Sequence, residues 1–331
     1  MSPSRLQFPA RAALALCLAA AALVPCGARS ADYPVRPLRI IVPYPPGGAT
    51  DVVTRLAGEV LHERMGQAVV VENRPGADGV IGVDATIKAG ADGYTLTIMP
   101  GASLITLPIL KKNVPFDPLT DLAPLSMVFK YGQILAVNSE VPVKTLSEWV
   151  AYVKANPGKL NRGVIGTGVL LQAAITDTAL GIQGLLVPVN YKGNSLAGQA
   201  LMANEVQFMN SDLTTVTPGL KSGRIRVLAV TTPTRMPALP DAPTVAETLS
   251  PGFELTSVFG FFAPAGTPRE VVQKLSAEFA ALSKSGPVND YIVNKIAAIP
   301  VGSTADELAQ WMRSDFAREK QAAQQLKVQP E

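Results

Sequence analysis

Histidine and cysteine are almost absent from this chain of 331 residues. It has one histidine, His62, and two cysteines, Cys17 and Cys26. A Ser-His-Asp triad could use only His62, and a zinc site needs several Cys or His ligands. His62 stands opposite the apolar stripe of its expected helix, so we expect it at the surface. The sequence therefore predicts no catalytic residue, no metal site and no cofactor.

The sequence signatures of a phosphate-binding loop and of a nucleophile elbow are also missing. The chain contains neither G-x-x-x-x-G-K-[ST] nor G-x-S-x-G. The spacing Gly76-x-x-Gly79-x-x-Gly82 lacks the G-x-G start of a dinucleotide loop. We interpret these glycines as serving a turn and helix packing.

The first 30 residues have the pattern of a secretory leader. Arg5 and Arg11 precede an apolar run over residues 12–24, and Ala28-Arg29-Ser30 offers small residues before a cleavage point after Ser30. We expect residues 1–30 to be removed and the mature protein to be periplasmic and without disulfides. The alternative, a lipid anchor at Cys26, is disfavoured by Pro25 beside it.

The charge of the mature chain is balanced. The chain has 29 Lys and Arg against 26 Asp and Glu, and the excess is the three arginines of the leader. A neutral mature chain gives no support to nucleic-acid binding. With 47% hydrophobic and 17% charged residues, residues 31–331 are typical of a well-buried globular protein with two lobes. We expect a monomer.

Short β-branched runs alternate with amphipathic helical stretches from Leu38 onward, which indicates a mostly parallel α/β fold. We expect lobe one at residues 31–131 and 255–331, and lobe two at residues 132–254. The chain would cross between lobes near residues 129–133 and 255–260, and such crossings act as hinges beside an interlobe cleft. T-x-x-E capping boxes are expected at residues 145–148 and 267–270.

Two glycine-bearing turns each follow a strand and precede a helix. The first spans residues 44–51 after the strand 38–43, and the second spans residues 73–79 after the strand 68–72. A helix N-terminus leaves backbone N–H groups unpaired and carries about half a positive charge, and glycine lets a ligand approach the backbone. The two turns therefore predict an anion site. We expect residues 100–103 to form a third loop at the same edge.

These motifs resemble a known family across almost all of the mature chain. The first three are Ile40 to Gly48 followed by Asp51, Val69 to Ala77, and Asp92 to Leu96. Later segments that agree are 115–118, 156–160, 191–193, 228–231, 239–244 and 263–268. Together they closely resemble the extracytoplasmic receptors of tripartite tricarboxylate transporters, the Bug family.

The resemblance implies a two-lobed, type II-like periplasmic-binding-protein fold that closes on a small organic carboxylate and delivers it to membrane permease subunits. It also implies that the ligand is held largely by backbone groups. In lobe one, the matching positions are Tyr44, Pro45, Gly47, Gly48, Ala49, Asp51, Ala77, Asp78 and Gly79. In lobe two, they are Gly166, Thr167, Gly168, Val169 and Gln172 in one loop, then Tyr191, Asn210 and Ser211.

Four positions depart from the family pattern. Asp78 stands where a glycine is usual, Val169 where a serine is usual, Gln172 where a histidine is usual and Asn210 where an aspartate is usual. If these residues line the cleft, the ligand has a less polar or aromatic distal portion, or a distal group that an amide recognises. The alternative is that these positions do not contact ligand.

Several other residues have two interpretations. Asp51 would repel a carboxylate, so we favour a role in capping the first helix over contact with the ligand. Arg74 is expected to brace its turn beside Glu72 rather than to bind ligand, and Trp149 and Trp311 are expected to be packing residues. Thr167 and Ser211 remain candidates as hydrogen-bond donors to the ligand.

Three functions use the same cleft. The first is a transport receptor, and the second is a sensor that presents its closed form to a signalling partner. The third, an exported enzyme, is disfavoured by the missing His and Cys. The sequence leaves the carboxylate unidentified.

Overall fold

The computed structural model describes residues 33–331 except 192, 329 and 331. The expected leader with its cleavage point, Cys17 and Cys26 lie outside the described residues, as does Lys192 in the 191–193 motif. Residues 33–35 group with the preceding segment, and residues 36–331 form one compact unit.

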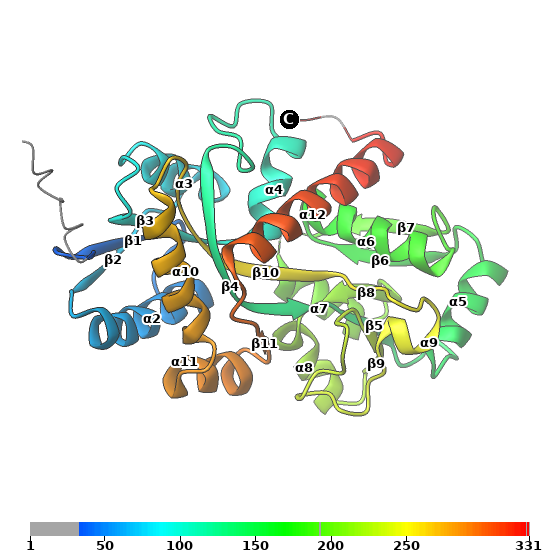
Figure 1. Cartoon of the computed structure of the whole chain (residues 1–331). Coiled ribbons are helices and arrows are strands. Elements are labelled where there is room, and N and C mark those ends of the chain that lie inside the picture. Colours follow the sequence, from blue (N-terminus) through cyan, green and yellow to red (C-terminus); the bar gives the residue numbers. More distant parts are fainter. Residues whose placement is uncertain (1–32, 192, 329, 331) are drawn as a thin grey trace, which may run out of the picture. The chain divides into compact units, whose positions relative to one another are not determined.

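A six-stranded sheet forms the first lobe, in the strand order β11-β4-β10-β3-β1-β2 (Figure 1). Its strands are β1 (Leu38–Val42), β2 (Val69–Asn73), β3 (Thr95–Pro100), β4 (Leu122–Gly132), β10 (Thr256–Pro264) and β11 (Ile299–Pro300). The strand β1 is parallel to β2 and β3, whereas β10 is antiparallel to β3 and β4. Its helical segments are α2 (Ala49–Met65), η1 (Ala77–Gly79), α3 (Val80–Ile87), α4 (Gly101–Leu110), α10 (Arg269–Leu282), α11 (Gly286–Asp290), η2 (Tyr291–Lys295) and α12 (Ala305–Gln325).

A five-stranded sheet forms the second lobe, in the order β7-β6-β8-β5-β9. Its strands are β5 (Ile134–Asn138), β6 (Leu160–Val164), β7 (Leu186–Asn190), β8 (Phe208–Ser211) and β9 (Ile225–Val230). Its helices are α5 (Leu146–Ala155), α6 (Gly166–Leu180), α7 (Asn194–Met202), α8 (Leu213–Lys221) and α9 (Val245–Thr248). The fold is thus the expected α/β fold with two sheets and two lobes. The expectation of mostly parallel strands is wrong, because β10 and β11 in the first sheet and β5 in the second pair antiparallel with their neighbours.

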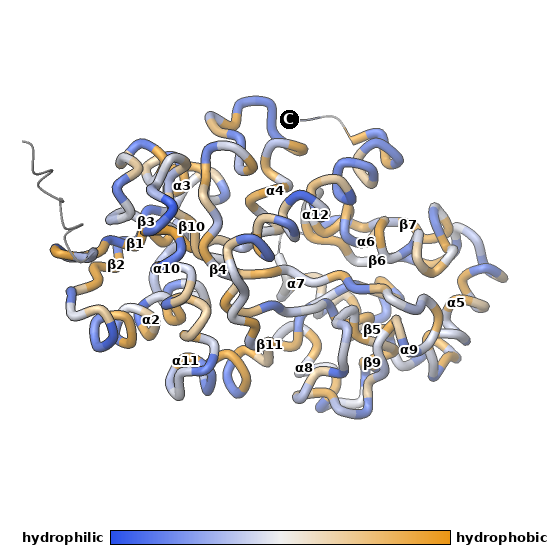
Figure 2. The backbone as a smooth tube through the Cα atoms, viewed as in Figure 1, coloured by the Kyte–Doolittle hydropathy of each residue, from blue (hydrophilic) through white to orange (hydrophobic). Residues whose placement is uncertain are grey.

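Both faces of the second sheet are buried. Alternate residues of β5 point to opposite faces, so Leu135 joins the apolar cluster beneath α5, whereas Ile134 joins the cluster beneath α7 and α8. Trp149 is fully buried and stacks on Phe208 with ring centroids 4.7 Å apart, as expected for a packing residue. Figure 2 shows the same pattern, with hydrophobic residues along the strands and hydrophilic residues in the outer loops.

The chain crosses between the sheets at Gln133 and again before β10. The hydroxyl of Thr231 accepts a hydrogen bond from the Gln133 N–H at 2.7 Å and donates one to the Leu255 carbonyl at 2.6 Å. Gly132 is required here because a Cβ at this position would lie 2.5 Å from Thr232 Cγ2. Both crossing segments are therefore tied to one buried hydroxyl.

The C-terminal helix α12 joins the two lobes. It packs against β4 and α4 of the first lobe and against α6 of the second. Ala322 and Ala323 of α12 form an apolar cluster with Leu171 of α6, and Leu110 of α4 packs against it. The interlobe contact at this side is thus apolar.

Three local expectations are wrong. Residues 101–103 form the first turn of α4 rather than a loop, and a Cβ at Gly101 would lie 2.5 Å from the Trp311 ring. The glycine thus serves close packing. Likewise, Gly166 to Gln172 begins helix α6 rather than forming a loop.

The third error concerns the expected capping box at residues 267–270. Helix α10 has Pro268 as its N-cap, which shifts Glu270 out of the N3 position, and Thr267 Oγ1 donates instead to the Pro264 carbonyl at 2.7 Å. The capping box at residues 145–148 is confirmed, and two further ones occur at residues 244–247 and 304–307.

No helix within the described part of the chain is both long and apolar enough to cross a membrane.

Candidate ligand-binding site

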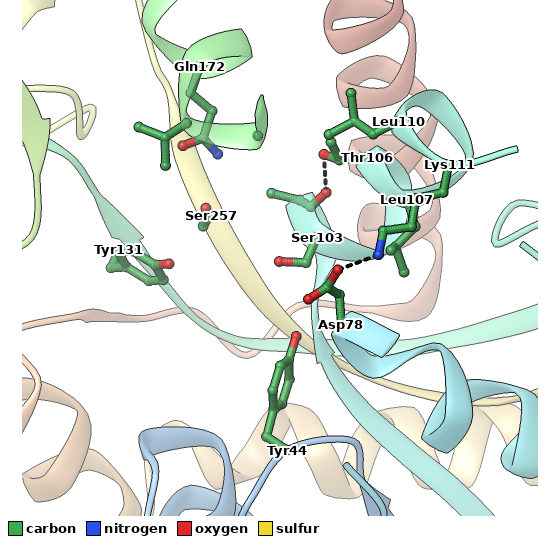
Figure 3. A pocket seen from close by; sticks show the side chains of 13 residues that line it. Tyr44, Asp78, Ser103, Thr106, Leu107, Leu110, Lys111, Tyr131, Gln172 and Ser257 are labelled. Atoms are coloured by element: carbon green, nitrogen blue, oxygen red, sulfur yellow. Dashed lines mark hydrogen bonds and ion pairs between the residues drawn. The ribbon is translucent and has the colours of Figure 1, made fainter. Parts of the chain in front are cut away.

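A cavity of about 390 Å³ lies between elements of the two lobes (Figure 3). It is lined by Tyr44, Asp78, Ala102, Ser103, Thr106, Leu107, Leu110, Lys111, Tyr131, Gly168, Val169, Gln172 and Ser257. A smaller cavity of about 130 Å³ shares four of these residues. Its lining is Tyr131, Gln133, Ile165, Val169, Gln172, Asn210, Ser211, Asp212 and Ser257.

The first glycine-bearing turn, which joins β1 to α2, is held by Asp51. The Asp51 carboxylate accepts hydrogen bonds from the Gly47 N–H at 2.9 Å, from Arg55 and from Asn73 Nδ2. Burial opposes its ionisation, but these donors together hold the pKa of Asp51 below its usual value. Asp51 therefore holds the turn before helix α2 and does not cap the helix, because the N-cap is Gly48 and no side chain caps it.

Asn73 connects the two turns. It ends β2 opposite Val42 of β1, and its Nδ2 also donates to the Tyr44 carbonyl at 3.1 Å. Because adjacent parallel strands end at the same edge of a sheet, both turns reach the same edge. In the second turn Arg74 pairs with Glu72 at 2.5 Å, which agrees with its expected role as a brace.

The second turn has an unusual backbone. Ala77, Asp78 and Gly79 all have positive φ, at 47°, 56° and 100°. Residues with a Cβ pay a steric cost in this region, and such strain collects at functional sites. Asp78 lines the cavity and forms an ion pair of 2.5 Å with Lys111, which follows α4 (Figure 3).

Tyrosine and serine side chains line the cavity with their hydroxyl groups. Burial raises the pKa of Tyr44 to about 12, although Ser103 bonds its hydroxyl. Burial likewise raises the pKa of Tyr131, which bonds Ser257, and the negative charge of Asp212 adds to this shift. Both phenols therefore stay neutral at physiological pH and can donate to an anion.

Helix N-termini from both lobes meet at the cavity. Ala102 and Ser103 belong to the first turn of α4, whereas Gly168 and Val169 belong to the first turn of α6. Each N-terminal turn carries unpaired N–H groups and a partial positive charge. The cavity thus receives two positive helix ends from opposite lobes.

Seven of the sequence-predicted site residues line one of the two cavities: Tyr44, Asp78, Gly168, Val169, Gln172, Asn210 and Ser211. Eight others lie outside both linings: Pro45, Gly47, Gly48, Ala49, Asp51, Ala77, Gly79 and Tyr191. The side-chain surroundings of Gly166 and Thr167 lie outside what the structure describes.

Sequence reasoning missed the residues that α4, β4 and β10 contribute. Ser103 and Thr106 lie on α4, Tyr131 on β4 and Ser257 on β10. Tyr131 and Ser257 come together only because β4 and β10 pair antiparallel, with Tyr131 opposite Ser257. A local signal existed only for Ser103, in the glycine-bearing segment that was expected to be a loop.

Within the described residues, no group of three or more His, Cys, Asp or Glu side chains could hold a metal ion. The site instead offers neutral hydroxyls, amides, one lysine beside an aspartate, and two helix ends. Such an arrangement can hold an anionic solute through hydrogen bonds.

Two lobes with a cavity between them are typical of a solute-binding protein, and solved structures of periplasmic binding proteins have the same fold. The periplasmic binding protein BugD superposes with a TM-score of 0.67 at 30% identity, covering 90% of this chain and all of its own. Residues 53–328 match the tripartite tricarboxylate transporter family receptor. The chain therefore belongs to this receptor family, whose members bind solutes and are not enzymes.

Other relatives also match most of this chain, and two of them were solved with different ligands. BugT of Bordetella pertussis is 33% identical over 293 residues, which is 87% of this chain and 89% of BugT. Rpa4515 of R. palustris was solved with adipate, at 31% identity, TM-score 0.70, and coverage of 90% of this chain and 100% of its own. MatC of Rhodopseudomonas palustris was solved with malate, at 27% identity, TM-score 0.65, and coverage of 88% and 99%.

Proposed function

We propose that this protein captures a small organic carboxylate in the 390 Å³ cavity and delivers it to the membrane permease subunits of a tripartite transporter. The observation that carries the proposal is the convergence of the α4 and α6 N-terminal turns on one cavity. Two partial positive charges from opposite lobes favour an anion that bridges them. The adipate and malate of two relatives are anions of suitable size.

Ligand capture proceeds by closure of the two lobes. A ligand that contacts both helix ends stabilises the closed form more than the open form, and the population shifts accordingly. Thr231 and Gly132 lie where the chain crosses, so they serve as the hinge. The lobe boundaries in this proposal are residues 131/132 and 254/255.

The mature protein is periplasmic and monomeric in this proposal. Its leader is removed after Ser30, and the lobe-one turns at residues 44–51 and 76–79 contribute backbone N–H groups to the ligand when the lobes close. The positions carried over from the family, from Tyr44 to Ser211, contribute contacts to the ligand together with the cavity residues Ser103, Tyr131 and Ser257.

Calorimetry and thermal unfolding with mono-, di- and tricarboxylates test the function. A ligand at one hundred times its dissociation constant stabilises the folded state by about 2.7 kcal/mol. We expect at least one carboxylate to do so, with weaker binding at high salt. Stabilisation by cationic or uncharged solutes alone would overturn the proposal.

A further inference from the structure

Three amide side chains form a continuous hydrogen-bonded chain beside the smaller cavity. Asn210 Nδ2 donates to Gln133 Oε1 at 2.8 Å and to Thr176 Oγ1 at 3.2 Å. Gln133 Nε2 in turn donates to Gln172 Oε1. All three amide residues line the 130 Å³ cavity, whereas Thr176 stands behind them on α6.

Thr176 decides which way the Asn210 amide points. The Thr176 hydroxyl donates its proton to the backbone carbonyl of Gln172 at 3.0 Å, and a carbonyl can only accept. The Thr176 oxygen then serves as an acceptor, and it accepts from the Asn210 NH₂ group at 3.2 Å. Both Asn210 N–H donors are then used, and Asn210 Oδ1 is the atom left over.

Asn210 Oδ1 is a buried acceptor with no hydrogen-bond partner among the described residues, and Ser211 Oγ beside it has none there either. Asn210 is only 3% exposed, so water does not compensate it well. A buried polar atom left unpaired costs about 1–3 kcal/mol. The cost is recovered when a bound molecule presents a hydrogen-bond donor to this atom.

The surroundings disfavour a second carboxylate at this position. Asp212 lines the same cavity, and its carboxylate caps α8 by accepting from the Thr215 N–H at 2.9 Å. Another carboxylate near Asn210 Oδ1 would set oxygen against oxygen and a negative charge near Asp212. A hydroxyl, an amide N–H or an ammonium group would meet no such repulsion.

We infer that the ligand is a monocarboxylate with a hydrogen-bond donor at its distal end, and that Asn210 Oδ1 and Ser211 Oγ accept from that donor. This inference rests on the proposed capture of a carboxylate and narrows it. It sets this chain apart from a receptor for simple dicarboxylates. Asn210 is thus a specificity-determining residue, and Thr176 is the residue that orients it.

Calorimetry with acids of equal length but different distal ends tests the inference. One series is hexanoate, 6-hydroxyhexanoate, 6-aminohexanoate and adipate, and the shorter series is butyrate, 4-hydroxybutyrate, 4-aminobutyrate and succinate. In at least one series we expect the hydroxyl- or amino-ended acid to bind at least about tenfold more tightly than its methyl- and carboxylate-ended counterparts. The hydroxyl and amino arms distinguish a neutral donor from a cationic one.

Two variants test whether Asn210 and Thr176 cause the preference for a donor-ended acid. Asn210→Leu should reduce the affinity of the donor-ended acid to that of the methyl-ended acid. Thr176→Val removes the acceptor that orients Asn210 without entering the cavity, and should reduce the preference for a donor at least about threefold. Thr178→Val is the matched control, because Thr178 on the same helix makes the same type of bond, to the Ala174 carbonyl at 2.9 Å, away from Asn210. It should leave the preference unchanged.

The possible failures are distinguishable. If no carboxylate in any panel binds, the proposed function fails and the assignment of Asn210 fails with it. If the methyl- or carboxylate-ended acids bind as tightly as the donor-ended ones, the function stands and the inference is overturned. An unchanged preference in Thr176→Val also overturns it, and this variant serves if Asn210→Leu does not fold.

Discussion

The hydroxyl of Thr106 lies between the Ala102 carbonyl, 2.5 Å away, and the carboxyl group of Glu319. Its single proton can go to only one of them. The Thr106 hydroxyl donates to the Glu319 carboxyl group, which favours the ionised form of Glu319, whereas burial opposes it. Glu319 is buried, and it lies directly behind a residue of the ligand cavity.

Glu319 makes the stability of the protein depend on pH near neutrality. Burial raises its pKa from an ordinary 4.5 to about 7, although Thr106 and Arg318 oppose this shift. Between these values the folded state binds a proton that the unfolded chain releases, so the contribution is fully present below pH 4.5 and is lost as pH rises to about 7. The loss is on the order of 3 kcal/mol.

Glu319→Gln should remove this dependence. The variant keeps a neutral side-chain acceptor for the Thr106 hydroxyl at every pH. Urea unfolding at pH 5 and pH 8 should therefore show a larger fall in the free energy of unfolding for the wild type than for the variant. Equal falls in both proteins would show that Glu319 does not titrate in this range.

We expect the Asp78 carboxylate to lower the affinity of the cavity for anions. It lines the cavity and pairs with Lys111, so it both repels a carboxylate and occupies the lysine. We expect Asp78→Asn to tighten carboxylate binding about three- to tenfold at low salt, and Lys111→Ala to weaken it by a similar factor. Calorimetry at two salt concentrations measures both.

Lys88 supplies the control for this experiment. It forms an equivalent exposed pair with Asp84 at 2.7 Å on helix α3, outside the lining of the cavity. Lys88→Ala should leave carboxylate binding unchanged. An equal loss of affinity in Lys88→Ala and Lys111→Ala would mean that only the net charge of the protein matters.

The hydroxyl of Thr231 supports the crossing between the lobes. Thr231→Val leaves the Gln133 N–H without an acceptor and the Leu255 carbonyl without a donor, both in the interior. We expect the free energy of unfolding to fall by about 1–3 kcal/mol. Thr231→Ser keeps the hydroxyl and should lose less. If valine were as stable as serine, these hydrogen bonds would contribute little.

Gly101 is required for packing rather than for a turn. A Cβ there would lie 2.5 Å from the Trp311 ring and 2.9 Å from Val258 Cγ2. We expect Gly101→Ala to destabilise the protein by about 1–3 kcal/mol in denaturant unfolding. Gly286→Ala, at a helical glycine with open space around its Cα, is the control and should be neutral or slightly stabilising.

Much of the first lobe could be predicted from local pattern. The strand near 38–42, the helix that ends at Gly66 and the following strand all occur where alternation and glycine indicate them. At residues 101 and 166, glycine wrongly indicated a loop. At Gly101 it permits contact with Trp311, and at Gly166 it begins a helix. A glycine in sequence does not distinguish a turn from a close contact, because both need the missing Cβ.

By itself the sequence determined the α/β class, the family motifs, the two turns at the ends of β1 and β2, and the scarcity of catalytic side chains. These features depend on residues near one another in the chain. Only the tertiary structure decided that Tyr131 lies opposite Ser257 and that Thr106 contacts Glu319. It also decided that the Asn210 NH₂ group donates to Thr176, which leaves Asn210 Oδ1 as the acceptor for a ligand. Those contacts join segments that are 34 or more positions apart, so they follow from strand pairing and helix packing rather than from local preference.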